Sequence, residues 1–271
     1  MKRYLWLILS VVLLVGGLYM VLKPTVIDHM VINPYVVEKA TEDMDEVTAE
    51  DIAENNKRIQ DKNKHLVSAS DDSDSSETSD IIDTPDTLDD SVETAVNADG
   101  YTYPVSDDPN IVYDASVVES IGQVPLNASV NYDYMVGEIY MPDVGMRVPI
   151  LEGISNENLW VGAGTMKPGQ KMGEGNYALA GHHMWDEEQL FTPITKSKIG
   201  DKAYVTDKNK VYEYTVTDIF VVQPSDGHVI NDVPGEQTLT LVTCTDVWGT
   251  ERLIVTGELT DVSEYEADAA A

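Results

Sequence analysis

The chain has 271 residues, which is enough for one sizeable domain with further segments or for two small domains. Its 48 Asp and Glu residues and 17 Lys and Arg residues give a formal net charge of −31. Such a surface repels the phosphates of nucleic acids, so no nucleic acid partner is expected. Cys244 is the only cysteine, which excludes an internal disulfide.

Residues 5–22 form an apolar run that is about long enough to cross a bilayer as a helix. Lys2 and Arg3 precede the run and only Lys23 follows it closely, which favours a cytoplasmic N-terminus. A cleavable signal peptide is the alternative, but no Ala-x-Ala-like cleavage site follows the run. We therefore expect residues 1–23 to be a cytoplasmic tip and an uncleaved, single-pass transmembrane signal anchor.

Residues 24–110 are polar and acidic, and we expect an extracytoplasmic stalk that is largely disordered. Within it, Ile52, Ile59 and Leu66 recur seven residues apart, which is too thin an apolar stripe to bury a helix. Residues 66–110 contain thirteen acidic residues and no Lys or Arg. Such a composition cannot bury enough apolar surface to fold, so it predicts a self-repelling spacer.

From residue 111 onward, short β-rich runs alternate with Gly, Pro, Asn and Asp. Short helical turns are expected only around residues 156–159 and 187–191. This texture predicts one all-β domain, a small barrel or sandwich, over residues 111–262, followed by an acidic and Ala-rich tail over residues 263–271. The strands are expected at residues 137–141, 148–151, 177–180, 202–206, 211–222, 238–244 and 253–259.

Three residues of this domain have the side chains that acyl transfer requires. Cys244 ends one strand and Arg252 opens the next apolar run eight residues later, so a hairpin would set them side by side. His182 follows a third strand. A thiolate is a nucleophile, a histidine can protonate a leaving amine, and an arginine can bind an oxyanion. From chemistry alone, a lone cysteine in a strand is more often a small buried residue, Arg252 could equally be a surface residue, and His182 could be an ordinary loop residue.

Several separated motifs resemble those of a class A sortase, the LPxTG-type cysteine transpeptidase of Gram-positive bacteria. Thr240-Leu241-Val242-Thr243-Cys244 fits the family's TLxTC signature, and Arg252 lies at the family's usual distance. Matching stretches are Ala178 to Met184, the preceding Gly162 to Lys167, and Gly137 to Pro142 followed by Val148-Pro149-Ile150. The resemblance covers about residues 111–262.

The resemblance implies a closed eight-stranded β-barrel with short helices and cleavage of an LPxTG-type sorting signal of surface proteins between Thr and Gly. Cys244 would form an acyl-enzyme thioester, which an amine of the peptidoglycan precursor lipid II would resolve. His182 would be the general acid and then the general base, and Arg252 would hold the oxyanion. Substrate-binding roles are implied for Thr243, His183, Ala180 and Ile254.

The implied substrate groove carries further expectations. Ala180 and Ile254 match positions that line it for the Leu-Pro part of the signal, and the loop 223–237 would wall it. Successive strand residues point to opposite faces, so His183 and His182 cannot serve equally if the strand continues. We expect no metal and no cofactor.

A second resemblance is only partial. Asp108-Pro109-Asn110 is faintly similar to the aspartate-proline-aromatic lid of pilin sortases, but Asn110 replaces the aromatic residue. Polymerising pilin activity is therefore not expected.

Two other classes of function stay open. One is another Cys–His–Arg acyl-transferase such as an L,D-transpeptidase, although the motifs usual there do not precede Cys244. The other is a non-catalytic, membrane-tethered β-domain for adhesion, which would not need Cys244. The sortase interpretation places the protein at the cell membrane with its catalytic domain outside.

Overall fold

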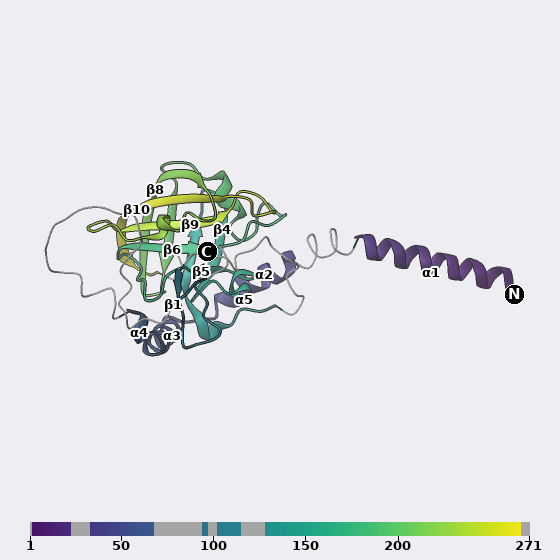
Figure 1. Cartoon of the computed structure of the whole chain (residues 1–271), viewed down its shortest axis with the longest axis horizontal. Helices are drawn as coiled ribbons and strands as arrows, with labels where there is room; N and C mark the ends of the chain where they lie inside the picture. Colours follow the sequence, from purple (N-terminus) through teal and green to yellow (C-terminus); the bar gives the residue numbers. More distant parts are fainter. Residues whose placement is uncertain (1, 23–32, 68–93, 97–101, 115–127, 267–271) are drawn as a thin grey trace.

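The structure is a computed structural model that describes residues 2–22, 33–67, 94–96, 102–114 and 128–266. Its centre is a closed β-barrel with the strand order β10-β8-β7-β3-β4-β5-β6-β9 (Figure 1). This confirms the predicted closed eight-stranded barrel, and the alternative of a sandwich is wrong. The core of the predicted spacer, residues 68–93, and the end of the predicted tail, residues 267–271, lie outside the described residues.

All seven expected strands are present in the barrel. The eighth strand, β5, was not predicted, because a strand of three residues is too short to show a period-two pattern. β10 continues past residue 262, because its last residues still pair with β8, so the predicted domain boundary is too early. The strands are β3 (Met135–Met141), β4 (Met146–Leu151), β5 (Ala163–Thr165), β6 (Asn176–Ala180), β7 (Lys202–Thr206), β8 (Lys210–Val222), β9 (Thr238–Cys244) and β10 (Arg252–Glu264).

The helices include the expected turn α5 (Asn156–Leu159) and three 3-10 helices, η3 (Tyr132–Tyr134), η4 (Thr192–Lys196) and η5 (Gly227–Ile230). The turn expected at 187–191 is wrong, because the helical segment begins at Thr192, where Pro193 suits a first turn. N-terminal to the barrel lie α1 (Lys2–Leu22), α2 (Asn33–Met44), α3 (Ala49–Lys62) and α4 (Lys64–Val67). None of the helices, so far as their residues are described, has both the length and the hydropathy needed to cross a membrane.

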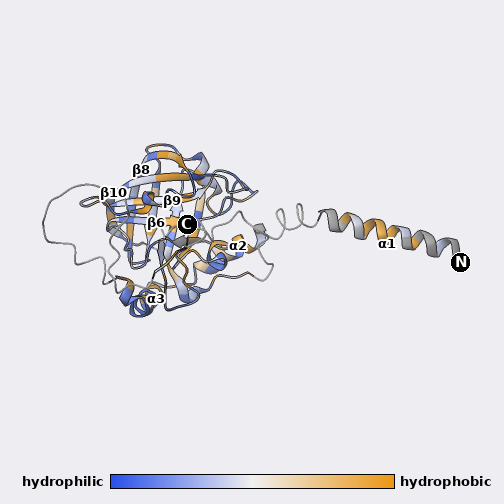
Figure 2. Cartoon of the chain, in the orientation of Figure 1, coloured by the Kyte–Doolittle hydropathy of each residue, from blue (hydrophilic) through white to orange (hydrophobic). Residues whose placement is uncertain are grey.

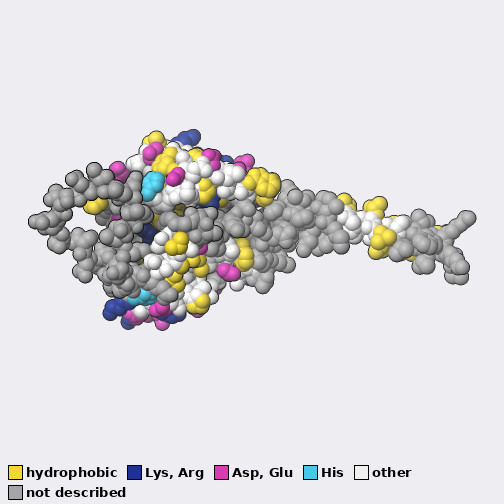
Figure 3. All heavy atoms as spheres, in the orientation of Figure 1, with side chains coloured by type: hydrophobic (Ala, Val, Ile, Leu, Met, Phe, Trp, Pro, Cys, Tyr) yellow, Lys and Arg dark blue, Asp and Glu magenta, His cyan; other side chains and the backbone are white. Residues whose placement is uncertain are grey.

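Alternation along the strands separates two apolar clusters. Leu179 of β6, Leu241 of β9 and Val255 of β10 belong to the main core inside the barrel, whereas Ala180 and Val242 belong to a second cluster. Successive strand residues face opposite sides, so neighbours in sequence supply different clusters. Orange, apolar segments lie along barrel strands such as β6 and β8, and also along α1 (Figure 2). On the visible outer face, acidic, basic and apolar side chains are mixed (Figure 3).

Helices α2 and α3 pack on the barrel, so the prediction of a disordered stalk is wrong for residues 33–67. Ile52 and Ile59 are almost fully buried, and Asn55 lies between them on the same helical face. The Asn55 amide donates to the carbonyl oxygens of Tyr132 at 2.6 Å and Met135 at 3.0 Å. The buried face of α3 is thus completed by Asn55, a polar residue whose hydrogen bonds are satisfied by the barrel. A search for apolar periodicity does not count such a residue, so it underestimates the buried face.

Two further features belong to this N-terminal region. Thr48 caps α3 through reciprocal hydrogen bonds with Asp51, which fixes where the helix begins. The short strands β1 (Thr94–Val96) and β2 (Thr102–Pro104) pair in a separate sheet within the segment expected to be spacer. The predicted stalk over residues 24–110 is therefore partly folded.

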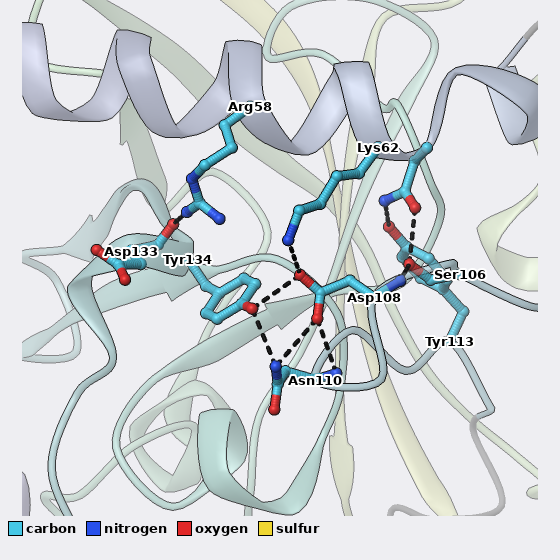
Figure 4. Close-up of polar contacts among 9 residues, drawn as sticks. Arg58, Lys62, Ser106, Asp108, Asn110, Tyr113, Asp133 and Tyr134 are labelled. Atoms are coloured by element: carbon cyan, nitrogen blue, oxygen red, sulfur yellow. Dashed lines mark hydrogen bonds and ion pairs between the residues drawn. The ribbon is translucent and has the colours of Figure 1, made fainter.

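Asp108 is the centre of a polar cluster that joins α3 to the barrel (Figure 4). Its carboxylate accepts hydrogen bonds from the Lys62 ammonium at 2.7 Å and the Tyr134 hydroxyl at 2.8 Å. Asn110 donates to the same carboxylate from its backbone and its side chain. Burial favours the neutral acid, but these donors outweigh it and lower the pKa of Asp108 to about 2. The Asp108-Pro109-Asn110 segment is therefore part of a structural junction.

A second polar contact fastens α2 to the barrel. Glu138 of β3 is fully buried and accepts a hydrogen bond from Arg147 of β4 at 3.0 Å. The Arg147 guanidinium also binds Asp45, which follows α2, at 2.6 Å. Lys208 donates to the carbonyl oxygens of Met44 and Val47, at and beyond the C-terminal end of α2. Residues 33–67 are thus an integral layer of the folded domain.

Candidate active site

Cys244 and Arg252 are direct partners across two antiparallel strands. Cys244 is the last residue of β9 and Arg252 is the first residue of β10, and the pairing register sets them opposite each other. The connection is closed by a hydrogen bond from the Thr245 amide to the Glu251 carbonyl at 3.1 Å. Residues opposite each other in a sheet point to the same face, so the thiol and the guanidinium share one side. This is the hairpin arrangement that the sequence predicts.

His182 reaches the same place from the neighbouring strand. β6 runs parallel to β9 with Ala180 beside Val242, and the Gly181 amide continues the pairing by donating to the Val242 carbonyl at 3.1 Å. Side chains alternate along β9, so Cys244 shares the face of Val242. His182 follows the end of β6, and the positive charge of Arg252 lowers its pKa, which places the imidazole near the guanidinium. A Cβ atom at position 181 would collide with the Phe191 ring, so glycine is required immediately before His182.

The environment of these three residues disfavours charge on two of them. His182 is almost fully buried; burial first, and then the positive charge of Arg252, lower its pKa to about 4. Burial also raises the pKa of the Cys244 thiol, with Arg252 opposing and Asp246 adding to that effect. Both groups are therefore neutral at pH 7.

Arg252 supplies the permanent positive charge of the site. It is half-buried, and Nη1 donates to the carbonyl oxygens of Gly249 at 3.0 Å and Glu251 at 3.4 Å. These contacts hold the guanidinium against its own loop. A charge placed so would stabilise a thiolate or an oxyanion on the shared face.

His183 and Thr243 contact the same strands in other ways. The His183 Nδ1 atom lies 2.9 Å from the Cys244 carbonyl oxygen, in hydrogen-bond contact with the backbone of that residue. The Thr243 hydroxyl is buried and donates to the Gly181 carbonyl oxygen at 2.8 Å. Both contacts tie the segment that carries His182 to the end of β9.

Ala180 and Ile254 lie in the second apolar cluster. Ala180 is two residues before His182, and Ile254 is two residues after Arg252. Ile230 of η5, within the loop 223–237, packs in this cluster. Sequence reasoning missed the remaining members, although the (i, i−2) spacing of Val242 from Cys244 was a usable signal. The other buried members are Ile154, Leu159, Ala178 and Val242.

The loop 223–237 is fastened to β6 and to the segment after β5. The Asp232 carboxylate accepts from the Lys167 ammonium at 2.7 Å and from the backbone amide of Asn176 at 2.7 Å. The Asn176 side chain donates to the carbonyl oxygens of Val229 and Asn231. Within the described part of the chain, no group of three or more His, Cys, Asp or Glu residues is placed to hold a metal ion.

Comparisons with known sequences agree on one family. The sortase domain family matches residues 139–260. A sortase A of Streptococcus agalactiae serotype III (strain NEM316) is 45% identical over 161 residues, covering 56% of this chain and 65% of that protein. A Bacillus subtilis (strain 168) protein named as a sortase, YwpE, is 42% identical over 97 residues, covering 35% of this chain and 94% of that protein.

Solved structures give the same family name. A sortase A of Listeria monocytogenes is 40% identical with a TM-score of 0.49, covering 50% of this chain and 93% of that chain. A pilus-related sortase C of Group B Streptococcus is 29% identical with a TM-score of 0.46, covering 56% of this chain and 80% of that one.

The fold and the site define a closed β-barrel protein with a thiol, an imidazole and a guanidinium collected at the ends of adjacent strands. Since 94% of YwpE is matched at 42% identity, the chain belongs to the sortase family. It spans less than two thirds of the streptococcal sortase A, at 65% of that length.

Proposed function

We propose that this protein is a class A sortase, a cysteine transpeptidase that cleaves an LPxTG-type sorting signal of surface proteins between Thr and Gly. The observation that carries the proposal is the direct pairing of Cys244 with Arg252, beside the strand end that presents His182. A nucleophile, a proton carrier and a fixed cation on one face are what acyl transfer through a thioester needs.

The proposed reaction starts from the neutral pair. The Cys244 sulfur attacks the Thr carbonyl carbon while its proton passes to His182, and Arg252 stabilises the oxyanion. The imidazolium of His182 then protonates the leaving Gly amine, which leaves a thioester. An amine of the peptidoglycan precursor lipid II attacks this thioester and gives a proton to His182. His182 passes this proton to the leaving sulfur, so Cys244 is released as a thiol.

The second apolar cluster supports the substrate assignment. Ala180 and Ile254 share the face of the reactive residues, and a Leu-Pro segment needs an apolar surface of this kind. We propose that His183 and Thr243 act at this site by keeping the two strand ends in place, because both contact backbone atoms there.

Peptide transfer tests the proposal directly. The full chain in detergent is incubated with a fluorescent LPxTG-type peptide and a glycine or alanine nucleophile, and mass spectrometry identifies the products. We expect cleavage between Thr and Gly and a product joined to the nucleophile. A protein that binds the peptide but never cleaves it would favour the adhesion domain, and cleavage elsewhere would favour another acyl-transferase.

We also propose that residues 1–23 anchor the protein, with the N-terminus in the cytoplasm and the barrel outside. The support is the apolar run of residues 5–22 that follows Lys2 and Arg3. Membrane fractionation of cells tests this location. The full-length chain should stay with the membrane, whereas a mature protein that begins near Lys23 in the medium would show a cleaved signal peptide.

A further inference from the structure

Glu152 is a buried carboxyl group that the proposed mechanism does not use. It directly follows the end of β4 and is almost fully buried. Its Oε1 atom accepts a hydrogen bond from the Tyr113 hydroxyl at 2.6 Å, and Tyr113 is itself buried in the main core. Burial raises the pKa of Glu152, and hydrogen bonds from Tyr113 and Thr165 oppose that rise. A buried carboxyl group destabilises a fold unless donors satisfy it, so Glu152 and its two hydroxyl donors act as one unit.

This unit fixes the short loop between β4 and α5, residues 152–155. The Gly153 amide donates to the Thr165 hydroxyl at 2.8 Å, which leaves the proton of that hydroxyl for Glu152. The Asn158 side chain donates to the carbonyl oxygens of Glu152 at 2.7 Å and Gly153 at 3.1 Å. The loop is therefore held from β5, from α5 and, through Tyr113, from the segment that precedes the barrel.

Residues 108–114, which we call the strap, hold the same loop through the backbone. The Ile154 amide donates to the Val112 carbonyl oxygen at 2.7 Å. Gly153 has a φ of +80°, and a Cβ atom there would lie 2.9 Å from the same oxygen, so glycine is required for this close approach. The strap begins at Asp108, in the junction with α3, which gives it a fixed end.

Ile154 connects this loop to the second apolar cluster, where it is fully buried with Ala180 and Ile254. A Cβ atom at Gly164 would lie 3.0 Å from the Ile154 side chain, so β5 packs tightly against it. Interiors packed at this density transmit small displacements to their neighbours. Partly exposed apolar residues pack against the buried members and offer surface to a ligand; they are Met166, Phe220, Val222 and Val229.

We propose that Tyr113 and Glu152 are positioning residues that set the place of Ile154 and thereby the fit of the Leu-Pro part of the donor peptide. This rests on the proposed function, which places that part on the second apolar cluster. Both residues act through the loop 152–155 and not on the reacting atoms. They therefore determine binding of the donor and leave the chemistry at Cys244 unchanged.

Tyr113→Phe tests this role, because it removes one hydroxyl and keeps the ring in the core. In full-length protein in detergent, we expect the KM for an LPxTG-type peptide to rise about three- to tenfold, a usual size for residues that act on a site through others. The kcat should stay within about twofold, and the KM for the amine acceptor is the internal reference.

Tyr214→Phe is the matched control for the loss of a buried hydroxyl. The Tyr214 hydroxyl lies in β8 and accepts a hydrogen bond from the Gly173 backbone amide at 2.9 Å. This variant should lower the urea midpoint without changing the KM for the donor peptide. An equal rise of that KM in Tyr113→Phe and Tyr214→Phe would show a general loss of stability and overturn the proposal.

Thr165→Val gives a second, independent variant. It keeps the shape of the side chain but removes the hydroxyl that Gly153 and Glu152 share. The KM for the donor peptide should rise as in Tyr113→Phe, again with little change in kcat. A KM that stays at the wild-type value in either variant would overturn the proposal.

A readout without catalysis keeps this test apart from that of the proposed function. NMR of isoleucine δ1 methyl groups in the Cys244→Ala protein reports on Ile154, whose signal is assigned with Ile154→Val. We expect this signal to shift when Tyr113→Phe is added and to keep its place with Tyr214→Phe. An unmoved signal in Tyr113→Phe would overturn the proposal. If the wild-type protein cleaves no LPxTG-type peptide, the proposed function fails, and the methyl signal still decides whether Tyr113 positions Ile154.

Discussion

The polar cluster around Asp108 and the polar residues around Cys244 treat charge in opposite ways. Lys62, Tyr134 and Asn110 donate to the buried Asp108 and lower its pKa to about 2. Burial holds His182 neutral, with a pKa of about 4, and raises the pKa of Cys244. The first cluster is a saturated structural junction. The second leaves room for charge to develop during a reaction, which is how proteins separate stability from catalysis.

The sharpest test of this difference is Cys244→Ala. We expect complete loss of thioester formation and of peptide cleavage, because the chain contains no other thiol. The Asp108 cluster should keep the domain folded, so circular dichroism and the unfolding midpoint should change little. Cleavage at a rate near that of the wild type would remove Cys244 from the role of nucleophile.

Histidine substitutions should separate the two neighbours. His182→Ala should lower turnover by about 10²–10⁴-fold, the usual effect of losing a general acid and base. His183→Ala should cost less, because its imidazole contacts the Cys244 backbone and not the reacting face. Steady-state kinetics of both variants decide between them; a larger loss in His183→Ala would reverse the assignment.

Arg252→Lys tests whether a positive charge alone suffices. Lysine keeps the charge but loses the planar guanidinium that can bind two acceptors at once. We expect turnover to fall about 10²–10³-fold, as when one oxyanion donor is lost. Turnover close to that of the wild type would show that Arg252 does not bind the oxyanion.

On the structural side of the comparison, Asp108→Asn should reduce stability and spare chemistry. Removing the charge weakens the bonds from Lys62 and Tyr134, and hydrogen bonds to a charged group contribute about 1.5–3 kcal/mol. Urea unfolding should show a loss of that size. The kcat of donor cleavage should stay within about twofold of the wild type, and a large fall would couple this junction to the reaction.

Lowering the pH should reduce the free energy of unfolding through both regions, but over different pH ranges. The pKa of His182 is about 4 in the folded protein and 6.5 when exposed, so the unfolded chain alone gains this proton as pH falls from 6.5 to 4. Between pH 7 and pH 5 this lowers the free energy of unfolding by about 2 kcal/mol.

The contribution of Asp108 has a different range. Its pKa is lowered from 3.8 to about 2, so its stabilisation is present above pH 3.8 and is lost as pH falls towards 2.

Between pH 7 and pH 5 only the His182 contribution changes. Urea unfolding at these two pH values should therefore show a smaller pH effect in His182→Gln than in the wild type. An equal effect in both proteins would mean that His182 is not held neutral.

The strands and the pairing of Cys244 with Arg252 were predictable because both are local, whereas closure of the strands into one barrel was implied only by the family resemblance, because it depends on pairs such as β6 with β9 that are distant in sequence. Period-two alternation marks strands, and an eight-residue spacing allows a hairpin. The approach of His182 from a parallel strand 62 positions before Cys244 came only through a family resemblance, because strand order leaves no periodic signal. The packing of α3 was missed for a related reason: Asn55 takes an apolar position and is satisfied only by carbonyl groups of the barrel.

The docked helical layer also decides where the chain can be cut for purification. A barrel produced from residue 111 would lose Lys62, Asp108 and Asp45, which neutralise or fix buried polar groups. It would also uncover the barrel surface that Ile52 and Ile59 cover, and uncovered apolar surface promotes aggregation. A truncation that removes only α1 and ends before Asn33 keeps the layer intact and is the form expected to stay monodisperse.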